Sequence, residues 1–107
     1  GGVRYKNSEK VKGCETVTID QQAVAMNWLA LGFSCDLWVD PPGQVWEDYR
    51  HATDEVIILV AGRLELEFGG RCIRLAPGEE ILIPAGVSHT VRNIGGTSVK
   101  WLYGYSR

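Results

Sequence analysis

Residues 43–62 read GQVWEDYRHATDEVIILVAG, and residues 78–93 read GEEILIPAGVSHTVRN. These two segments contain both histidines of the chain, His51 and His89, and the first also contains Glu55, four residues after His51. Each of the three falls on a predicted strand or at a strand end. Two imidazoles and one carboxylate form a ligand set that suits a transition metal. The segments therefore predict a metal site built on β structure.

The composition fits one small domain with a hydrophobic core. The chain has 107 residues, 45% of them hydrophobic, and its 11 basic and 13 acidic residues give a net charge of −2. Binding to phosphates needs clustered Lys and Arg side chains, and the basic residues here are scattered. No apolar run approaches the roughly 20 residues that cross a bilayer, and no signal-peptide pattern is found. We therefore expect a cytoplasmic protein that binds neither nucleic acid nor membrane.

Three cysteines, Cys14, Cys35 and Cys72, lack the C-x-x-C spacing of a structural zinc site. In a reducing compartment they are expected to be small buried or surface residues. A reactive thiol that lines a pocket is the alternative.

Short alternating segments and turns rich in glycine and proline predict β-strands over most of the chain. Residues 1–15 are polar and are interpreted as an N-terminal arm, and residues 16–107 as one domain. Residues 21–31 fit a helix or an extended segment equally well. From Phe33 onward, short strands alternate with turns such as Asp40-Pro41-Pro42-Gly43 and Gly69-Gly70. This spacing is typical of an all-β sandwich or barrel.

Alternation along a strand assigns side chains to faces. Val45, Glu47, Tyr49 and His51 are expected on one face, and Trp46 on the other. Arg92 is expected to point away from the candidate ligand positions.

Residues 56–60 are apolar on both faces, so the face that does not fill the barrel must be covered. The N-terminal segment or a second subunit could cover it, and the second alternative predicts a homodimer. On the last strand, Trp101 or Tyr103 is expected to line a pocket. Asn93, at the end of the preceding strand, is expected to satisfy backbone groups between strands.

The spacing of these residues resembles the two sequence motifs of the cupin family. The first motif is a glycine, five residues, H-x-H, three or four residues, a glutamate, six residues and a glycine; here the corresponding residues are Gly43, Tyr49-Arg50-His51, Glu55 and Gly62. The second is a glycine, five residues, P-x-G, two residues, a histidine, three residues and an asparagine, and every spacing is met by Gly78, Pro84, Gly86, His89 and Asn93. The resemblance covers residues 43–93. It implies a double-stranded β-helix, a jelly-roll barrel of two packed antiparallel sheets, with a metal in its interior.

The sequence departs from the family at Tyr49, which replaces the first histidine of H-x-H. The resemblance then implies that His51, Glu55 and His89 hold one divalent transition metal: Fe, Mn, Ni, Zn or Cu. Tyr49 is the candidate catalytic residue. It could coordinate as a phenolate, act as acid or base, hydrogen-bond a metal-bound water, or fill space with its ring.

Two functions are open on these grounds. Three protein ligands leave positions for water or substrate, as in catalytic metal sites, and two histidines with one carboxylate are the pattern of non-haem iron oxygenases. A metal-dependent dioxygenase acting on a small molecule is therefore expected first, and lyase or isomerase chemistry is equally open to the family. The alternative is a non-catalytic barrel that binds or senses a small molecule.

Overall fold

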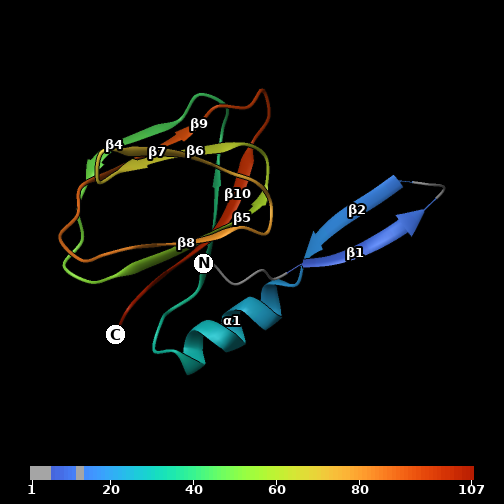
Figure 1. The fold of residues 1–107 in the computed structure, drawn as a ribbon, viewed down its shortest axis with the longest axis horizontal. Helices are drawn as coiled ribbons and strands as arrows, with labels where there is room; N and C mark the ends of the chain where they lie inside the picture. The colour runs from blue at the N-terminus through green and yellow to red at the C-terminus, as the bar shows by residue number, and fades with distance from the viewer. Residues whose placement is uncertain (1–5, 12–13) are drawn as a thin grey trace.

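The computed structural model of the chain describes residues 6–11 and 14–107, with side chains from residue 18 onward except residue 48. Two four-stranded antiparallel sheets pack face to face (Figure 1). One sheet has the order β3 (Asp36–Asp40), β10 (Val99–Tyr105), β5 (Glu55–Ala61) and β8 (Glu80–Ile83). The other has the order β4 (Val45–Tyr49), β9 (His89–Asn93), β6 (Leu64–Phe68) and β7 (Arg71–Leu75). The predicted all-β jelly-roll barrel is confirmed.

The main hydrophobic core lies between the two sheets. Strand β6 shows how the sequence builds it: Leu64 and Leu66 are buried, whereas Glu67 is exposed on the outer face. At the end of this strand, Gly69 and Gly70 connect β6 to β7 with φ values of 58° and 73°. A two-residue turn with positive φ at both positions favours glycine, so the predicted hairpin is confirmed.

Residues 21–31, which fitted a helix or an extended segment, contain the helix α1 (Gln21–Ala30). Asp20 caps its first turn, because one carboxylate oxygen accepts a hydrogen bond from the backbone N–H of Ala23 at 3.1 Å. The chain leaves the helix through Gly32, whose φ of 87° is readily adopted by glycine.

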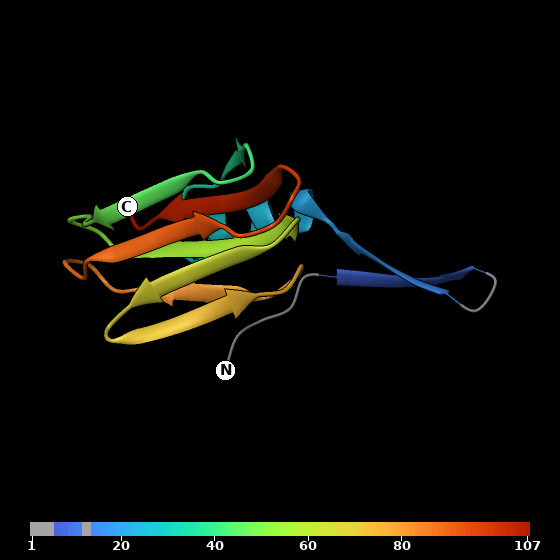
Figure 2. The same cartoon turned by 90° about the horizontal axis from the view of Figure 1, so that it is seen from above.

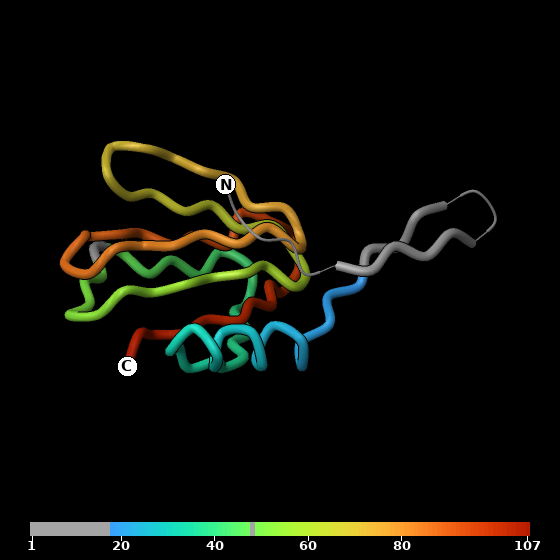
Figure 3. Tube along the Cα trace, turned by 60° about the horizontal axis from the view of Figure 1, so that its bottom comes forward, coloured from blue at the N-terminus to red at the C-terminus, as the bar shows by residue number. Residues whose placement is uncertain are grey.

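Helix α1 covers the outer face of β5 and β10 (Figure 3). Its residues Val24 and Trp28 are fully buried against Val56, Ile58 and Leu102. Strand β5 is therefore buried on both faces, as its sequence predicts. Helix α1 belongs to the N-terminal segment, which is one of the two elements expected to cover this face. Because α1 covers this face, the face no longer supports a homodimer. The homodimer stays a prediction.

The first two strands, β1 (Lys6–Val11) and β2 (Cys14–Ile19), form an antiparallel hairpin. The hairpin extends to one side of the barrel (Figure 2). The predicted boundary between residues 15 and 16 falls within β2, and the division into arm and domain stays a prediction. The rest of the predicted arm, residues 1–5 and 12–13, lies outside the described residues. Within the described part of the chain, no helix is long and apolar enough to cross a membrane.

Strand β4 departs from the predicted alternation. Its pairing with β9 shifts register between Trp46 and Tyr49, and both side chains line the same cavity inside the barrel. The prediction that they face opposite sides is wrong. An irregularity of this kind places an extra residue in one strand and reverses the alternation beyond it.

Candidate metal centre

Three strand ends position the predicted ligands at one end of the barrel. His51 follows β4, Glu55 begins β5 and His89 begins β9. Tyr49, two residues before His51, pairs with His89 across the β4–β9 ladder. The backbone N–H of Gly86 also donates a hydrogen bond to the carbonyl oxygen of His51 at 2.8 Å. The turn between β8 and β9 is thereby tied to the segment that carries His51.

The structure brings the three residues predicted from the motifs into one cluster. Glu55 Oε1 lies 3.5 Å from His51 Nε2 and 3.3 Å from His89 Nε2. One ligand atom from each residue lies within 4.8 Å of the others. Glu55 and His89 are only 6% and 4% exposed, and His51 is partly exposed. Two of the three residues are therefore buried, and the third is partly accessible to solvent.

One oxygen of the Glu55 carboxylate accepts no hydrogen bond from the described residues, although two imidazole nitrogens lie within 3.5 Å of it. This oxygen, Oε1, is buried. Burying a carboxylate is costly unless it is paired or bound to a metal, and no described Lys or Arg lies in the cavity beside it. A divalent cation between one carboxylate and two neutral imidazoles would remove this cost. The residues present therefore fit a metal.

The ring of His89 is oriented for such a role. Its Nδ1 lies 3.4 Å from the carbonyl oxygen of Val87. A proton on Nδ1 that donates to this carbonyl leaves Nε2, the atom beside Glu55, free to act as a ligand. Backbone carbonyls commonly fix metal-binding histidines in this way.

Tyr105 joins the cluster, although the sequence analysis did not single it out. Its hydroxyl lies 3.4 Å from His51 Nε2. Burial, and then the negative charge of Glu55, raises the pKa of Tyr105 to about 12. The hydroxyl therefore keeps its proton at neutral pH. The sequence does contain a signal for Tyr105, because alternation places it on the same face of β10 as Trp101 and Tyr103.

Tyr49 lines the cavity beside the cluster and is 43% exposed. Its ring centroid lies 6.2 Å from that of His51 and 5.6 Å from that of Trp46. Among the described residues, the hydroxyl that contacts the cluster is that of Tyr105. Tyr49 is thus placed at the wall of the cavity, next to the ligands and open to solvent.

A cavity of about 220 Å³ adjoins the three residues. Most of its remaining wall is aromatic, and Trp101 and Tyr103, the two residues expected to line a pocket, both contribute to it. The aromatic lining residues are Trp38, Trp46, Tyr49, Trp101, Tyr103 and Tyr105. The cavity therefore offers a largely apolar space beside the polar cluster.

Asn93, the last residue of the second motif, has the structural role expected of it. Its side-chain amide donates to the carbonyl oxygens of Pro41 at 2.9 Å and Thr97 at 3.0 Å. Its Oδ1 accepts from the backbone N–H of Gly95 at 3.1 Å. It therefore ties together two turns at the end of the barrel.

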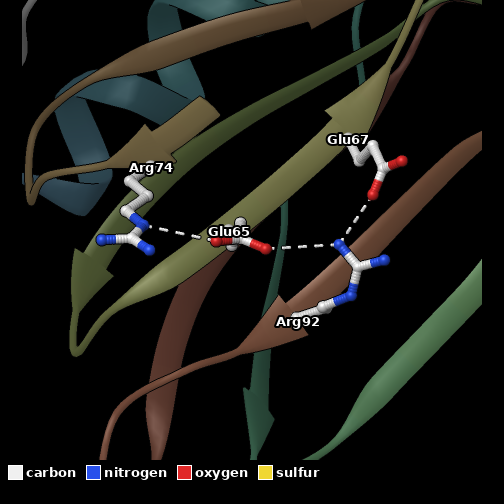
Figure 4. Close-up of polar contacts among 4 residues, drawn as sticks. All are labelled: Glu65, Glu67, Arg74 and Arg92. Carbon is white, nitrogen blue, oxygen red and sulfur yellow. Dashed lines mark hydrogen bonds and ion pairs between the residues drawn. The ribbon is translucent and has the colours of Figure 1, made fainter. Parts of the chain in front are cut away.

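A second polar cluster lies on the outer face of β6, β7 and β9 (Figure 4). Glu65 pairs with Arg74 and Arg92, at 3.3 Å in each case, and Glu67 pairs with Arg92 at 2.9 Å. The hydrogen bond from Arg74 is the main reason that the pKa of Glu65 lies below its usual value. As predicted from strand alternation, Arg92 points away from the candidate ligands.

The described thiols show no activation. Cys35 and Cys72 are both free. Burial is the largest cause that raises the pKa of each thiol, and Asp36 adds to it at Cys35 and Glu65 at Cys72. Since the thiolate is the reactive form, these residues fit the expected role of small buried or surface side chains. The side chain of Cys14 lies outside the described residues.

Comparison with known proteins connects this geometry to a family. The family model described as a cupin domain matches residues 36–105. A stretch of 63 residues is 27% identical to polyketide synthase CurC of Streptomyces cyaneus; it covers 59% of this chain and 41% of that protein. This chain thus matches about two fifths of that relative's length.

Among solved structures, TT1209 from Thermus thermophilus matches with a TM-score of 0.63 and 28% identity, over 70% of this chain and 73% of that one. A cupin 2 conserved barrel domain protein from Salinispora arenicola CNS-205 matches with a TM-score of 0.64 and 24% identity, over 71% of this chain and 64% of that one. These likenesses agree with the two-sheet barrel described above.

Proposed function

The chain belongs to the cupin family, and on that premise we propose that it binds one divalent transition metal through His51, Glu55 and His89. The observation that supports this most strongly is that three ligand atoms lie within 4.8 Å of one another, and that the Glu55 oxygen among them is buried without a hydrogen bond among the described residues. Two imidazoles and a carboxylate suit Fe, Mn, Ni, Zn or Cu. The neighbouring cavity then receives a small-molecule ligand.

We further propose that the site is catalytic. Dioxygenase chemistry is the reaction that we propose first, and lyase and isomerase chemistry are the alternatives. A metal held by three protein ligands supplies Lewis-acid or redox chemistry at its open positions. The aromatic walls give the reacting groups largely apolar surroundings. Tyr105 holds a proton at its hydroxyl, 3.4 Å from His51 Nε2. Tyr49, at the cavity wall, is the candidate acid or base for the substrate.

The second candidate is a non-catalytic barrel that binds or senses a small molecule. The replacement of the usual first histidine by Tyr49 favours it, because one ligand of the family's set is absent. The likeness to a polyketide synthase favours an enzyme instead, but it covers only 41% of that protein. Turnover of a small molecule that depends on added metal would decide for the enzyme.

Elemental analysis of protein purified without chelator tests the metal proposal. We expect about one transition metal per chain, and a loss of most of it in His89→Ala. Arg92→Ala is the matched control, because residue 92 lies on the same strand but carries its side chain on the outer face. Equal metal content in wild type and His89→Ala would contradict the proposal.

The homodimer is also kept as a proposal. With the outer face of β5 covered by α1, the support for it is the exposed apolar side chains Met26, Leu29 and Leu31 on and just after that helix. Light scattering at micromolar concentration should give twice the mass of one chain. A monomeric mass would rule the homodimer out. Residence in the cytoplasm stays a prediction from the sequence.

A further inference from the structure

Aromatic rings form a closed loop of contacts around the cavity. Neighbouring rings in the loop have centroids 4.8–6.3 Å apart. In order around the loop, the residues are Tyr103, Trp38, Trp46, Tyr49, His51 and Tyr105. His51 belongs to the candidate metal centre, so the loop is continuous with it. We call the four residues from Tyr103 to Tyr49 in this order the aromatic wall.

The rings of the aromatic wall meet nearly at right angles. Trp38 makes interplanar angles of 81° with Tyr103 and 69° with Trp46, and Trp46 makes one of 77° with Tyr49. A planar aromatic ligand stacks best on parallel rings, as in a slot. Rings at right angles instead form the sides of a box. A box of this kind suits a compact cation, which is attracted to the faces of several rings at once.

The charges around the wall also favour a cation. Asp40 is 4% exposed, and its two carboxylate oxygens accept hydrogen bonds from the indole N–H groups of Trp38 and Trp46, each at 2.8 Å. This carboxylate fixes the orientation of both rings and places a negative charge behind them. None of the described residues that line the cavity is Lys or Arg.

The size of the cavity limits the ligand. Its volume of about 220 Å³ is below the ~300–1,000 Å³ of pockets that take drug-sized molecules. A polycyclic ligand would not be enclosed. A small group with methyl-covered positive charge would fill the box and contact several rings.

We propose that the aromatic wall formed by Trp38, Trp46, Tyr49 and Tyr103 binds a methylated ammonium group, with Asp40 as the residue that positions the two indoles. The ligand is then a small quaternary ammonium compound. An oxygen at its other end reaches the cluster of His51, Glu55 and His89, and this second half of the inference rests on the proposed metal site.

Binding of choline, measured by tryptophan fluorescence and calorimetry, tests the inference. The reference is 3,3-dimethyl-1-butanol, which has the same shape and hydroxyl group but no charge. Choline should bind about tenfold more tightly than this alcohol, because only the cation is attracted to the ring faces. Equal affinities, tighter binding of phenol than of choline, or no choline binding at millimolar concentrations would each overturn the inference.

Two variants locate the binding to the wall. Trp38→Leu keeps an apolar side chain but removes a ring, and Trp38 is 41% exposed, so the barrel core is not altered. Choline affinity should decrease about fivefold. Asp40→Asn should weaken it as well, because an amide cannot accept from both indoles with its two atoms. Unchanged choline affinity in Trp38→Leu would overturn the inference, whether or not Asp40→Asn folds.

Glu80→Gln is the matched control. Glu80 also accepts a hydrogen bond from an indole N–H, that of Trp28, at 2.6 Å, but Trp28 belongs to α1 and packs on the outer face of β5, not in the cavity. Choline affinity should be unchanged in this variant, and a loss as large as that in Asp40→Asn would count against the inference.

The comparison also separates this inference from the metal proposal. Both probes carry the same hydroxyl group, so any bond to a metal cancels in the ratio of their affinities. Protein that proves metal-free but prefers choline refutes the metal centre alone. Protein that holds a metal but shows no preference refutes the aromatic wall alone.

Discussion

Two polar clusters share strand β9, and they differ in how their charges are balanced. On the outer face, Arg92 bridges Glu65 and Glu67, and every carboxylate in that group has a guanidinium partner (Figure 4). On the inner face, three residues earlier on the same strand, His89 lies against Glu55, whose Oε1 is buried without a donor among the described residues.

The difference shows where function is to be sought in this barrel. Exposed ion pairs contribute little to stability, because water competes for both partners. A buried carboxylate oxygen that accepts no hydrogen bond is unfavourable unless it is paired or bound to a metal. The outer cluster is complete as the protein stands, and we propose that the inner one is completed by a cation. The following predictions test that contrast, from the largest effect to the smallest.

The largest effect should come from removing the charge of the inner carboxylate. In Glu55→Gln, added metal should no longer stabilise the protein. In wild type, and in Glu65→Gln as the outer counterpart, metal at a thousand times its Kd should add about 4 kcal/mol to the free energy of unfolding. Urea unfolding with and without metal measures this. Equal metal-induced stabilisation in Glu55→Gln and Glu65→Gln would break the contrast between the clusters.

A backbone change in β10 should disturb the inner site and leave the outer cluster intact. A methyl group at Gly104 would clash with the carbonyl oxygen of Ser34 and come within 3.0 Å of the Trp28 ring. Gly104→Ala should therefore cost about 1–3 kcal/mol and displace Tyr105.

Gly96→Ala is the control, because a Cβ there meets no atom within 4 Å. Thermal unfolding compares the two variants. A stability of Gly104→Ala equal to that of Gly96→Ala would show that β10 can move away from α1 without cost.

A smaller effect is expected from Arg92→Ala on the outer face. The loss of stability should be slight and should shrink further in high salt, since exposed charges are screened. Because the pKa of Glu65 lies below its ordinary 4.5 in the folded protein, its contribution is present above pH 4.5 and is lost as the pH falls through the folded pKa. Urea unfolding at neutral and acidic pH should show only a slightly flatter acid dependence in the variant, because Arg74, the main cause of the low pKa of Glu65, is still present. A large, salt-independent loss would mean that the outer cluster is not a surface network.

The smallest effect concerns Glu80, the partly buried carboxylate beneath α1. Burial raises its pKa above the ordinary 4.5, and the hydrogen bond from Trp28 opposes this only in part. The folded protein therefore holds this proton more tightly than the unfolded chain, so the contribution is full below pH 4.5 and is lost as the pH rises through the folded pKa. Glu80→Gln should remove this trend, which urea unfolding between pH 4 and 7 measures. If the same trend persisted in the variant, a group other than Glu80 would be its cause.

Much of this architecture could be predicted because it depends on local pattern. The glycines, proline and asparagine of residues 78–93 determine turns, and turns determine where short strands begin. The same spacing placed His51, Glu55 and His89 at strand ends that meet at one end of the barrel. Outward-facing Arg92 followed from alternation alone.

The remaining features depend on contacts between distant segments. The register shift between Trp46 and Tyr49 arises from pairing with β9, so alternation along β4 alone could not place Trp46 in the cavity. Residues 21–30 form a helix because it packs on the outer face of β5. Their sequence shows no distinct apolar stripe, since apolar residues occur around most of the helix. Tyr105 contacts His51 only because β10 pairs with β5 and brings the end of the chain to the cluster.

We propose that the inner cluster binds a metal and that the outer one does not. A crystal of metal-loaded protein, examined by anomalous scattering at the absorption edge of the metal, tests it directly. We predict one peak at about 2.0–2.2 Å from the Nε2 atoms of His51 and His89 and from a carboxylate oxygen of Glu55. A peak at the outer Glu65 and Glu67, or no peak at the inner cluster at saturating metal, would contradict the account.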